Sequence, residues 1–465
     1  MLYSSPKQRC FPPVAGQTLR ADFEGGALSS DFGPLLFRGV DRQIGFTKRL
    51  ATALHDKRHQ SSIDHPLHDL LAQRIYQIAS GYADGNDANS LRRDPMFKLG
   101  VDRLPLEPEH DLARAPSFSR LEHSVDRKDL YRFMRAFVDH FIARYPEPPA
   151  AIVLDLDHSD DPTHGQQEFA FYNHYYKNHC YLPLFIFEGT SHALVLAYLR
   201  PGTRPTGADN AMSLVRLLSS LRHPWPRTHI LVRGDSHFAT PEVIDVIAHR
   251  RWTDFVFGLA GNAVILRHAA PVMQAAHCLH QQRTARAQAQ RTRPPASSRL
   301  YAEFPSAAAS WAQPWRVILK AEVLAAGDNP RFVVTSLEAP TPQIVYEDLY
   351  GARGNGANDS KALKGALHSD RTSATTFLAN AMRLLLSCAA SVLHHALRTH
   401  TLQHTALAQA QPSTVILTLC TIATQIKQYK DRILLHLPSA CPVKALLHRV
   451  TTLLCAIPVP VCNTS

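Results

Sequence analysis

In the middle of the chain, short apolar runs alternate with helical patterns, and this alternation limits the fold more than any other feature of the sequence. Runs with the length and composition of buried strands lie at residues 151–154, 229–232 and 255–259. Helical periodicity covers residues 211–221 and 241–250, which lie between these runs. Because strands that alternate with helices form a sheet covered by helices, this part of the chain predicts an α/β domain.

Two further strand-like runs, residues 181–187 and 193–199, are joined by a short turn and predict an antiparallel hairpin. A hairpin followed by strands that alternate with helices predicts a mixed sheet. Polar and apolar residues alternate again over residues 300–337, where we expect an inserted β-region. Helical patterns resume near Ser360 and dominate the remainder of the chain.

Three prolines, Pro146, Pro148 and Pro149, mark the start of the α/β part, because prolines this close together cannot continue a helix. The preceding residues, from about Phe37, carry mainly helical patterns. A chain of 465 residues is also too long for one compact core. We therefore predict four regions: a helical region at 1–145, which either binds DNA or forms an ordinary helical bundle, the first part of the α/β core at 146–260, a basic segment with the β-rich insertion at 261–340, and the core completion with a C-terminal helical region at 341–465.

The chain is basic, with 50 Lys and Arg against 39 Asp and Glu, a net charge of +11 and 26 His. A basic balance favours a polyanionic partner, nucleic acid before membrane, because the neutralisation of phosphates releases counterions. Five arginines fall in a stretch without an acidic residue, namely Arg283, Arg286, Arg291, Arg293 and Arg299. This stretch is either a contact for the DNA backbone or a solvated linker.

The eight cysteines are scattered, without a C-x2-C pair, so we expect neither a disulfide framework nor a structural zinc site. The first 20 residues have no apolar core of signal-peptide length. The most apolar stretch, residues 377–397, contains Arg383, His394 and His395, and it predicts a buried helix instead of a membrane span. We therefore expect a soluble cytoplasmic protein without a membrane partner.

Aspartates follow two of the strand-like runs, with Asp155 and Asp157 after residues 151–154 and Asp235 after residues 229–232. Carboxylates at strand ends can project together over one edge of a sheet, and a hard divalent cation needs such oxygen ligands. Two cations about 3.5–4 Å apart can activate a nucleophile and stabilise the leaving oxygen of a phosphodiester. A lone aspartate at a strand end is more often a turn former, so these positions alone are weak evidence.

Longer blocks of sequence surround these aspartates and resemble the DDE transposases of bacterial insertion sequences, which have an RNase H-like fold. The blocks that carry the resemblance are residues 74–99, 154–167 (first aspartate), 232–238 (second aspartate), 329–335 (the strand before the third block) and 370–373. The resemblance extends from about residue 30 to about residue 445. It implies an RNase H-like mixed sheet flanked by helices, with an N-terminal helical domain and a β-rich insertion before the third catalytic block.

The third block of this family has the pattern Y-x2-R-x3-E-x6-K on a helix. Tyr350, Arg353 and Lys364 occupy three of these positions at the required spacing, and the glutamate position is Ala357. The resemblance implies that the tyrosine, arginine and lysine contact DNA phosphates near the cleaved end. It also implies that the glutamate completes the catalytic metal site, whereas a methyl group cannot coordinate a cation.

No neighbouring acid has the register to replace the glutamate at position 357. Asp359 lies two residues further on, about 200° around a helix, so its side chain should face away. Glu347 and Asp348 precede the helix and lack the register. We therefore expect catalysis to be impaired in this chain.

The resemblance implies a site for two Mg²⁺ or Mn²⁺ ions with Asp157 and Asp235 as ligands, and the catalytic set is completed by the substituted position, Ala357. Asp157 is preferred to Asp155 because the family commonly has a hydroxyl residue two positions after the aspartate, as Ser159 is here. If the strand continues, Asp155 and Asp157 share one face, so sidedness does not separate them. The choice between the two stays open at this stage.

A group of aromatic and basic residues follows the first aspartate block, comprising Tyr172, His174, Tyr175, Tyr176 and Lys177. Such side chains can stack on flipped or single-stranded DNA. They can equally form a packed aromatic hairpin, which is the interpretation that the pattern favours.

The resemblance implies an enzyme that binds terminal inverted repeats and target DNA, cleaves and joins DNA strands, and bridges two transposon ends as a homodimer. Its location would be the bacterial cytoplasm, in association with the nucleoid. The alternatives are a catalytically inactive DNA-binding relic of a transposase and a metal-dependent nuclease with the same fold. The sequence leaves the repeat sequence, the target, the cleavage pathway and the oligomeric state open.

Overall fold

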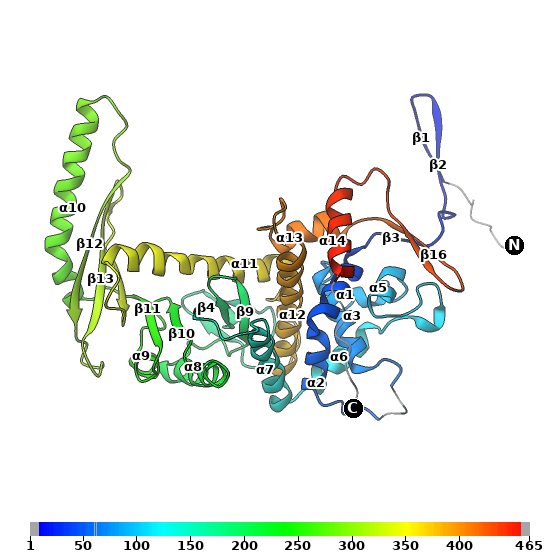
Figure 1. The fold of residues 1–465 in the computed structure, drawn as a ribbon, viewed down its shortest axis with the longest axis horizontal. Coiled ribbons are helices and arrows are strands. Elements are labelled where there is room, and N and C mark those ends of the chain that lie inside the picture. Colours follow the sequence, from blue (N-terminus) through cyan, green and yellow to red (C-terminus); the bar gives the residue numbers. More distant parts are fainter. Residues whose placement is uncertain (1–8, 60, 62, 457–465) are drawn as a thin grey trace. The chain divides into compact units, whose positions relative to one another are not determined.

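A computed structural model describes residues 9–456 except residues 60 and 62, and these residues form two compact units. The terminal unit consists of the described residues up to Asp129, Gly365–Ser369 and the described residues from Leu386 onward. The core unit consists of Leu130–Lys364 and Asp370–Leu385. Figure 1 labels the helices and strands along the chain.

The terminal unit is mainly helical. Its longer helices are α1 (Gly33–Ile44), α2 (Phe46–Ala53), α3 (Leu67–Ala79), α6 (Ala115–Ser124) and α14 (Lys444–Ala456). Its shorter helical segments are α4 (Asp87–Leu91), α5 (Pro95–Gly100), η2 (Pro108–His110), α13 (Pro412–Val415) and η5 (Ile416–Cys420). Its strands form a hairpin of β1 (Arg9–Val14) and β2 (Gln17–Ala21), and a three-stranded sheet of β3 (Leu28–Ser29), β16 (Thr424–Gln428) and β17 (Ile433–His436).

The core unit contains the predicted α/β part. Its strands are β4 (Ala151–His158), β5 (Asp161–Pro162), β6 (Phe171–Asn173), β7 (Asn178–Tyr181), β8 (Leu184–Glu188), β9 (Ala193–Tyr198), β10 (His229–Gly234), β11 (Thr253–Leu259), β12 (Ser297–Ser306), β13 (Trp315–Leu324), β14 (Gly327–Asp328) and β15 (Arg331–Thr335). Its helical segments are most of α7 (Arg127–Ala143), α8 (Gly207–Arg222), α9 (Pro241–Ala248), α10 (Ala263–Ala289), η3 (Ile344–Tyr350), η4 (Gly351–Arg353) and α11 (Gly354–Leu367).

One mixed sheet dominates the core unit. Its strand order is β12-β13-β15-β11-β10-β4-β8-β9, and β14 pairs with β13 as the ninth strand. β4, β10 and β11 are parallel, whereas β8, β9 and β15 run antiparallel to their neighbours. The strands β12 and β13 follow β11 in the sequence and precede the third block. In the sheet they lie beyond β15, at its edge. The mixed sheet flanked by helices that the sequence predicted, with its β-rich insertion, is therefore confirmed.

Different helices cover the two faces of this sheet. α7, α8, α9 and α10 pack with Leu154 and Leu156 of β4 in one large apolar core. On the other face, Val345 of η3 belongs to a smaller core, and the helical segment continues through η4 into α11. Because successive side chains of a strand alternate between the faces, Asp155 and Asp157 lie on the face of this second segment.

Two strands differ from their predicted bounds. β4 continues past the apolar run because residues 154–158 pair with β8, so Asp155 and Asp157 lie within the strand and do not follow its end. The run predicted at residues 181–187 is divided at Pro183 between β7 and β8. Proline has no N–H for a central strand, and the two halves belong to different sheets.

Helix α12 (Phe377–Thr401) contributes its first residues to the core unit and the others to the terminal unit. By length and composition, it is the one described helix that could cross a membrane. However, 78% of its most apolar window is buried within the protein. The buried helix predicted over residues 377–397 is therefore confirmed.

Candidate active site

The register of two parallel strands brings Asp157 and Asp235 to the same edge of the sheet. Asp155 of β4 pairs with Arg233 of β10; Asp157 lies two residues further along β4, and Asp235 directly follows the end of β10. Adjacent strands are about 4.8 Å apart, so the two carboxylates are close neighbours. The predicted metal ligands therefore lie together, on the sheet face that η3, η4 and α11 cover.

Asp155 has a different environment from Asp157. Its two carboxylate oxygens accept hydrogen bonds from Arg233, at 2.6 Å from Nε and 2.7 Å from Nη2, and both side chains are almost fully buried. Arg233 also donates to the carbonyl oxygen of Leu349 in η3, at 2.8 Å. Burial raises the pKa of Asp155, although the guanidinium of Arg233 acts in the opposite direction. This ion pair ties β4, β10 and η3 together and occupies both oxygens of Asp155.

The electrostatics of Asp157 and Asp235 reflect their proximity. Burial raises the pKa of Asp157, the charge of Asp235 adds to this effect, and Ser360 and Arg353 oppose it. Burial also acts on Asp235, but His237 outweighs it and lowers the pKa of that carboxyl. The backbone N–H of His237 donates to Asp235 at 2.9 Å, and its ring nitrogen Nδ1 lies 3.2 Å from the other oxygen.

A stripe of side chains from η4 and α11 faces these aspartates. Arg353, Ala357, Ser360 and Lys364 recur at steps of four, three and four residues, so they share one face of the helix. Arg353 Nη1 lies 4.0 Å from Asp157 Oδ1, and the buried Ser360 hydroxyl lowers the pKa of the same carboxyl. Ala357 is exposed and lies between these two residues on the stripe.

Tyr350 lies at the start of this segment and packs over the neighbouring strand β11. A β-carbon at Gly258 would come within 2.5 Å of the Tyr350 hydroxyl and 3.2 Å of the backbone nitrogen of Ser236. The guanidinium of Arg353 lies 5.8 Å from the centre of the Tyr350 ring, within the range of a cation–π interaction. Tyr350 and Arg353 are thus placed together beside the loop that follows Asp235.

Lys364 is held by the first aspartate block. Its ammonium group bonds to the carbonyl oxygen of Asp160, and lies 3.1 Å from Oδ1 of Asp160 and 3.9 Å from Oδ1 of Asp161. Asp161 is completely buried, and burial raises the pKa of this carboxyl well above its ordinary value, against the effect of Lys364. A phosphate bound by Lys364 would have to replace these contacts.

The family model described as transposase DDE domain group 1 matches residues 11–458 of the chain. The chain belongs to this family. Among solved structures it is similar to a piggyBac transposase in a synaptic complex with hairpin DNA, with 12% sequence identity and a TM-score of 0.41 over 93% of this chain and 87% of that chain. A comparison with curated proteins found no match. The resemblance to DDE transposases drawn from the sequence blocks is therefore confirmed.

DDE transposases generally use divalent metal ions, and the residues of this transposase fit such an ion only in part. Asp157 and Asp235 supply adjacent carboxylates, which suit a hard cation. Among the described residues, no group of three or more His, Cys, Asp or Glu side chains is arranged to hold a metal. The donor set therefore consists of two carboxylates on neighbouring strands and lacks a third.

Two of the acids that lie near Ala357 in the sequence, Asp359 and Glu347, are engaged elsewhere. Asp359 Oδ2 lies 2.9 Å from Nδ1 of His192, which precedes β9. Glu347 accepts a hydrogen bond from Tyr301 of the β-rich insertion. The expectation that neither acid has the register of the missing glutamate agrees with these contacts.

An aromatic cavity of about 460 Å³ lies beside the two aspartates. It is lined by His158 and His237 together with Tyr172, Tyr175 and Tyr176. Tyr172 and Tyr175 are 48% and 76% exposed, so these two rings are not packed into a core. The strands β6 and β7 form an antiparallel hairpin whose rings contact one another, as the sequence pattern favoured, and one side of Tyr172 and Tyr175 stays accessible.

The contact between Gly258 and Tyr350 gives a first prediction. Gly258→Ala should lower the free energy of unfolding by about 1–3 kcal/mol, because the added methyl group overlaps the Tyr350 hydroxyl in a packed region. Adding Tyr350→Phe should restore part of this loss, since it removes the overlapping oxygen. Chemical denaturation measures both effects. Gly165→Ala is the control, because a β-carbon there would have no neighbour within 4 Å, and an equal loss in both variants would contradict the prediction.

Proposed function

We propose that this transposase acts for an insertion sequence, binds its terminal inverted repeats, and cleaves and joins DNA strands with the help of a divalent cation. We further propose that Ala357 impairs the cleavage step. One observation supports the proposal: Asp157 of β4 and Asp235 at the end of β10 lie on neighbouring strands, near the helical stripe that carries Arg353 and Lys364. Carboxylates for a cation and cations for a phosphate thus meet at one edge of the sheet.

Each residue of this edge has a separate task in the proposed reaction. Asp157 and Asp235 would hold Mg²⁺ or Mn²⁺, which polarises a phosphoryl oxygen when bound. Arg353 would orient the scissile phosphate through its planar fork of donors, and Lys364 would bind a neighbouring phosphate as a point charge. Tyr350 would fix the position of Arg353 through its ring and donate its hydroxyl to the DNA backbone.

The partners follow from the reaction. An insertion sequence has two ends, so we propose that two copies of the chain bridge them and then engage target DNA. The net charge of +11 favours this polyanionic partner. The reaction would take place in the bacterial cytoplasm, where the element and its target are found.

A second candidate function is supported by the exposed methyl group of Ala357. A chain with two of three carboxylates could still occupy the transposon ends through Arg353 and Lys364 without cutting them. Such a protein would be a DNA-binding relic of a transposase, able to compete with an active copy for the ends. It would give salt-sensitive binding to the repeats and no cation-dependent product at any protein concentration.

The proposed function is tested on the DNA that flanks the gene. A duplex that carries the terminal inverted repeat should bind at least tenfold more tightly than a scrambled duplex of equal length, because base contacts add to the phosphate contacts. With Mg²⁺, the proposal expects slow cleavage at the element boundary and joining of the new 3′ end. Equal affinity for both duplexes would contradict it, and hydrolysis without joining would indicate a nuclease.

The contact proposed for Lys364 gives a second prediction. Lys364→Ala should lower the slope of log Kd against log salt by about 1 and weaken DNA binding severalfold, because one phosphate contact is lost. Fluorescence anisotropy with a labelled duplex measures both quantities. Arg216→Ala is the matched control, since Arg216 is exposed on α8, which covers the opposite face of the sheet. Identical slopes for the two variants would exclude Lys364 as a phosphate ligand.

A further inference from the structure

A second charged region of the core unit lies in the β-rich insertion. Between Asp254 and Glu303 the sequence contains no acidic residue, although acids make up 39 of the 465 residues of the chain. The same stretch contains six arginines, namely Arg267, Arg283, Arg286, Arg291, Arg293 and Arg299. Helix α10 and strand β12 carry four of them, and the connection between these elements carries Arg291 and Arg293. The basic stretch thus becomes one folded surface and is not a free linker.

Helix α10 packs on the insertion by one face only. Its buried side chains, Ile265, Ala269, Met273, Ala276 and Ala287, pack toward the strands. Arg283 and Arg286 are exposed, three residues apart, near the end of the helix. Among the described residues, neither arginine takes part in an ion pair. Their charges are therefore available to an external partner.

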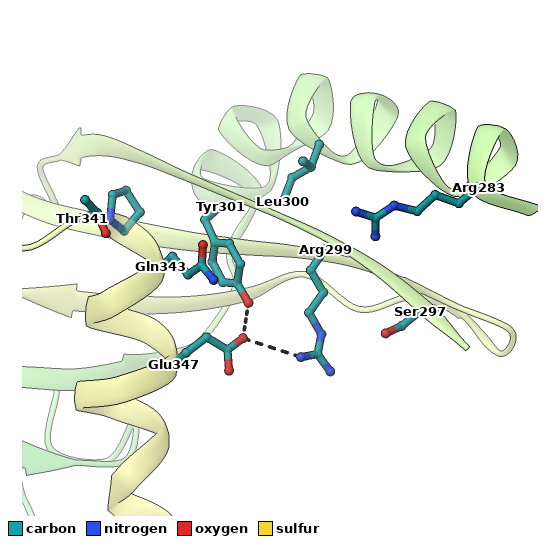
Figure 2. Close-up of a pocket in the computed structure, with 9 residues that line it drawn as sticks. Arg283, Ser297, Arg299, Leu300, Tyr301, Thr341, Gln343 and Glu347 are labelled. Atoms are coloured by element: carbon teal, nitrogen blue, oxygen red, sulfur yellow. Dashed lines mark hydrogen bonds and ion pairs between the residues drawn. The ribbon is translucent and has the colours of Figure 1, made fainter. Parts of the chain in front are cut away.

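Arg283 points into a groove of about 1050 Å³ (Figure 2). The groove is lined by α10, by Ser297, Arg299 and Tyr301 of β12, and by the segment from Thr341 to Glu347. Figure 2 shows Arg283 extending from α10 toward β12, whereas Arg299 extends from β12 toward Glu347. Both arginines line this groove, and guanidinium groups suit the oxygens of a phosphodiester backbone.

Arg299 is held in position by the insertion itself. Its Nε donates to Glu322 at 2.5 Å, and its Nη1 lies 3.7 Å from Glu347. Although burial opposes ionisation, Arg299, Lys320 and Asn329 lower the pKa of Glu322 to about 2, so this carboxylate is charged at neutral pH. Glu347 also accepts a hydrogen bond from Tyr301. Glu322 thus fixes the guanidinium, while Glu347 places a negative charge in the groove.

The groove is connected to the candidate active site by one helical segment. Glu347 lines the groove, and Arg353 lies six residues further along η3 and η4, beside Asp157. Six residues of helix rise by about 9 Å, which corresponds to about three phosphates of one DNA strand along the duplex axis. A duplex whose phosphate contacts Arg353 can therefore place a nearby phosphate in the groove.

We propose that this groove is a second binding site for the DNA backbone, in which Arg283 and Arg299 bind phosphates of the duplex that enters the active site. The inference rests on the proposed function, because it assigns the duplex at the two aspartates as the occupant. The insertion then holds the DNA close to the scissile phosphate. Glu347 weakens the binding by repulsion, so its removal has the opposite effect to the removal of either arginine.

The test measures the affinity of the full chain for a labelled 30-base-pair duplex of arbitrary sequence over a series of salt concentrations. Arg283→Ala combined with Arg299→Ala should lower the slope of log Kd against log salt by about 2 and weaken binding by about tenfold or more at 0.1 M salt. The control is the double variant Arg227→Ala with Arg251→Ala, which removes two positive charges, as the arginine pair of the groove does. Both control residues are exposed and precede β10 and β11, at the opposite end of these strands from Asp157 and Asp235.

Glu347→Gln tests the groove in the other direction and should tighten binding by about twofold to fivefold, since it removes a negative charge near the phosphates. Arg283→Ala alone guards against misfolding, because no described contact of its side chain is lost, and it should lower the slope by about 1. Equal slopes for the arginine pair and the control pair would overturn the groove site, as would unchanged affinity in Glu347→Gln. If the unaltered chain does not bind the duplex, the proposed function fails as well.

Discussion

Replacing Ala357 by glutamate should raise cation-dependent cleavage of a transposon end by at least about a hundredfold. A hundredfold change corresponds to about 2.7 kcal/mol of activation free energy, within the several kcal/mol that a catalytic metal ion contributes. The measurement is the rate of cleavage of an end-containing duplex with Mg²⁺, at a protein concentration that saturates the DNA. The unaltered chain and the variant should bind the duplex with similar affinity, so the difference lies in the chemical step.

The geometry of the helical stripe supports this expectation. Ala357 follows Arg353 by four residues and precedes Ser360 by three, and side chains at these spacings lie about 5–6 Å apart at their β-carbons. Both neighbours interact with Asp157. A longer side chain at the exposed position 357 therefore starts beside the two carboxylates and can extend toward a cation held between them.

Three controls separate this gain from other effects. Ala357→Gln has nearly the same shape and no charge, so it should leave cleavage close to the level of the unaltered chain. Ala357→Glu combined with Asp157→Asn should lose the gain, because the cation then lacks a second ligand. A chain with Ala357→Glu that binds the ends and still gives no product would favour the relic, and it would show that the defect extends beyond position 357.

The sequence predicted the fold well where local pattern and long-range packing agree. Helix α9 begins at the predicted residue and strand β15 lies within the predicted range 329–335, because their apolar periodicity matches the face that they bury. β4 was predicted too short, since Asp155 and Asp157 read as polar residues beyond a buried run. Their strand conformation depends on hydrogen bonds to β8, more than 20 residues away in the sequence. Such pairing partners are not encoded in the local pattern.

For the candidate active site, too, the sequence predicted the features that depend on local spacing and not the contacts between distant segments. The spacing of Tyr350, Arg353 and Lys364 placed three side chains on one helical segment, and a motif of this kind is visible in a sequence. The contacts that hold the side chains of the site come from distant parts of the chain and could not be identified from this spacing. Asp160 holds Lys364, and Arg233 holds Asp155. The sequence also contained no sign that Ser360 lies next to Asp157.

The structure separates Asp155 from Asp157 in a way that stability measurements can test. Asp155→Ala should lower the free energy of unfolding by about 3–5 kcal/mol, because it leaves the buried guanidinium of Arg233 without a counter-charge. The melting temperature should fall by roughly 6–20 °C. Asp157→Ala should change the stability by about 1 kcal/mol or less, since burial disfavours its charge and no ion pair of similar geometry is lost.

Binding of the cation should depend on Asp157 more than on Asp155, which is the reverse of the order expected for stability. Adding Mg²⁺ should raise the melting temperature of the unaltered chain, because the cation binds the folded state in preference to the unfolded state. Chelation should remove this effect. Asp157→Ala should abolish the Mg²⁺-dependent increase, as should Asp235→Ala.

The double variant Asp155→Leu with Arg233→Met tests the structural role of the ion pair directly. It should recover most of the stability that Asp155→Ala loses, because an apolar pair of similar volume avoids the desolvation of two charges. The recovered chain should also keep its response to Mg²⁺, since Asp155 uses both of its oxygens for Arg233 and none for the cation. A Mg²⁺ response that disappears with Asp155 and persists without Asp157 would reverse the assignment of the first metal ligand.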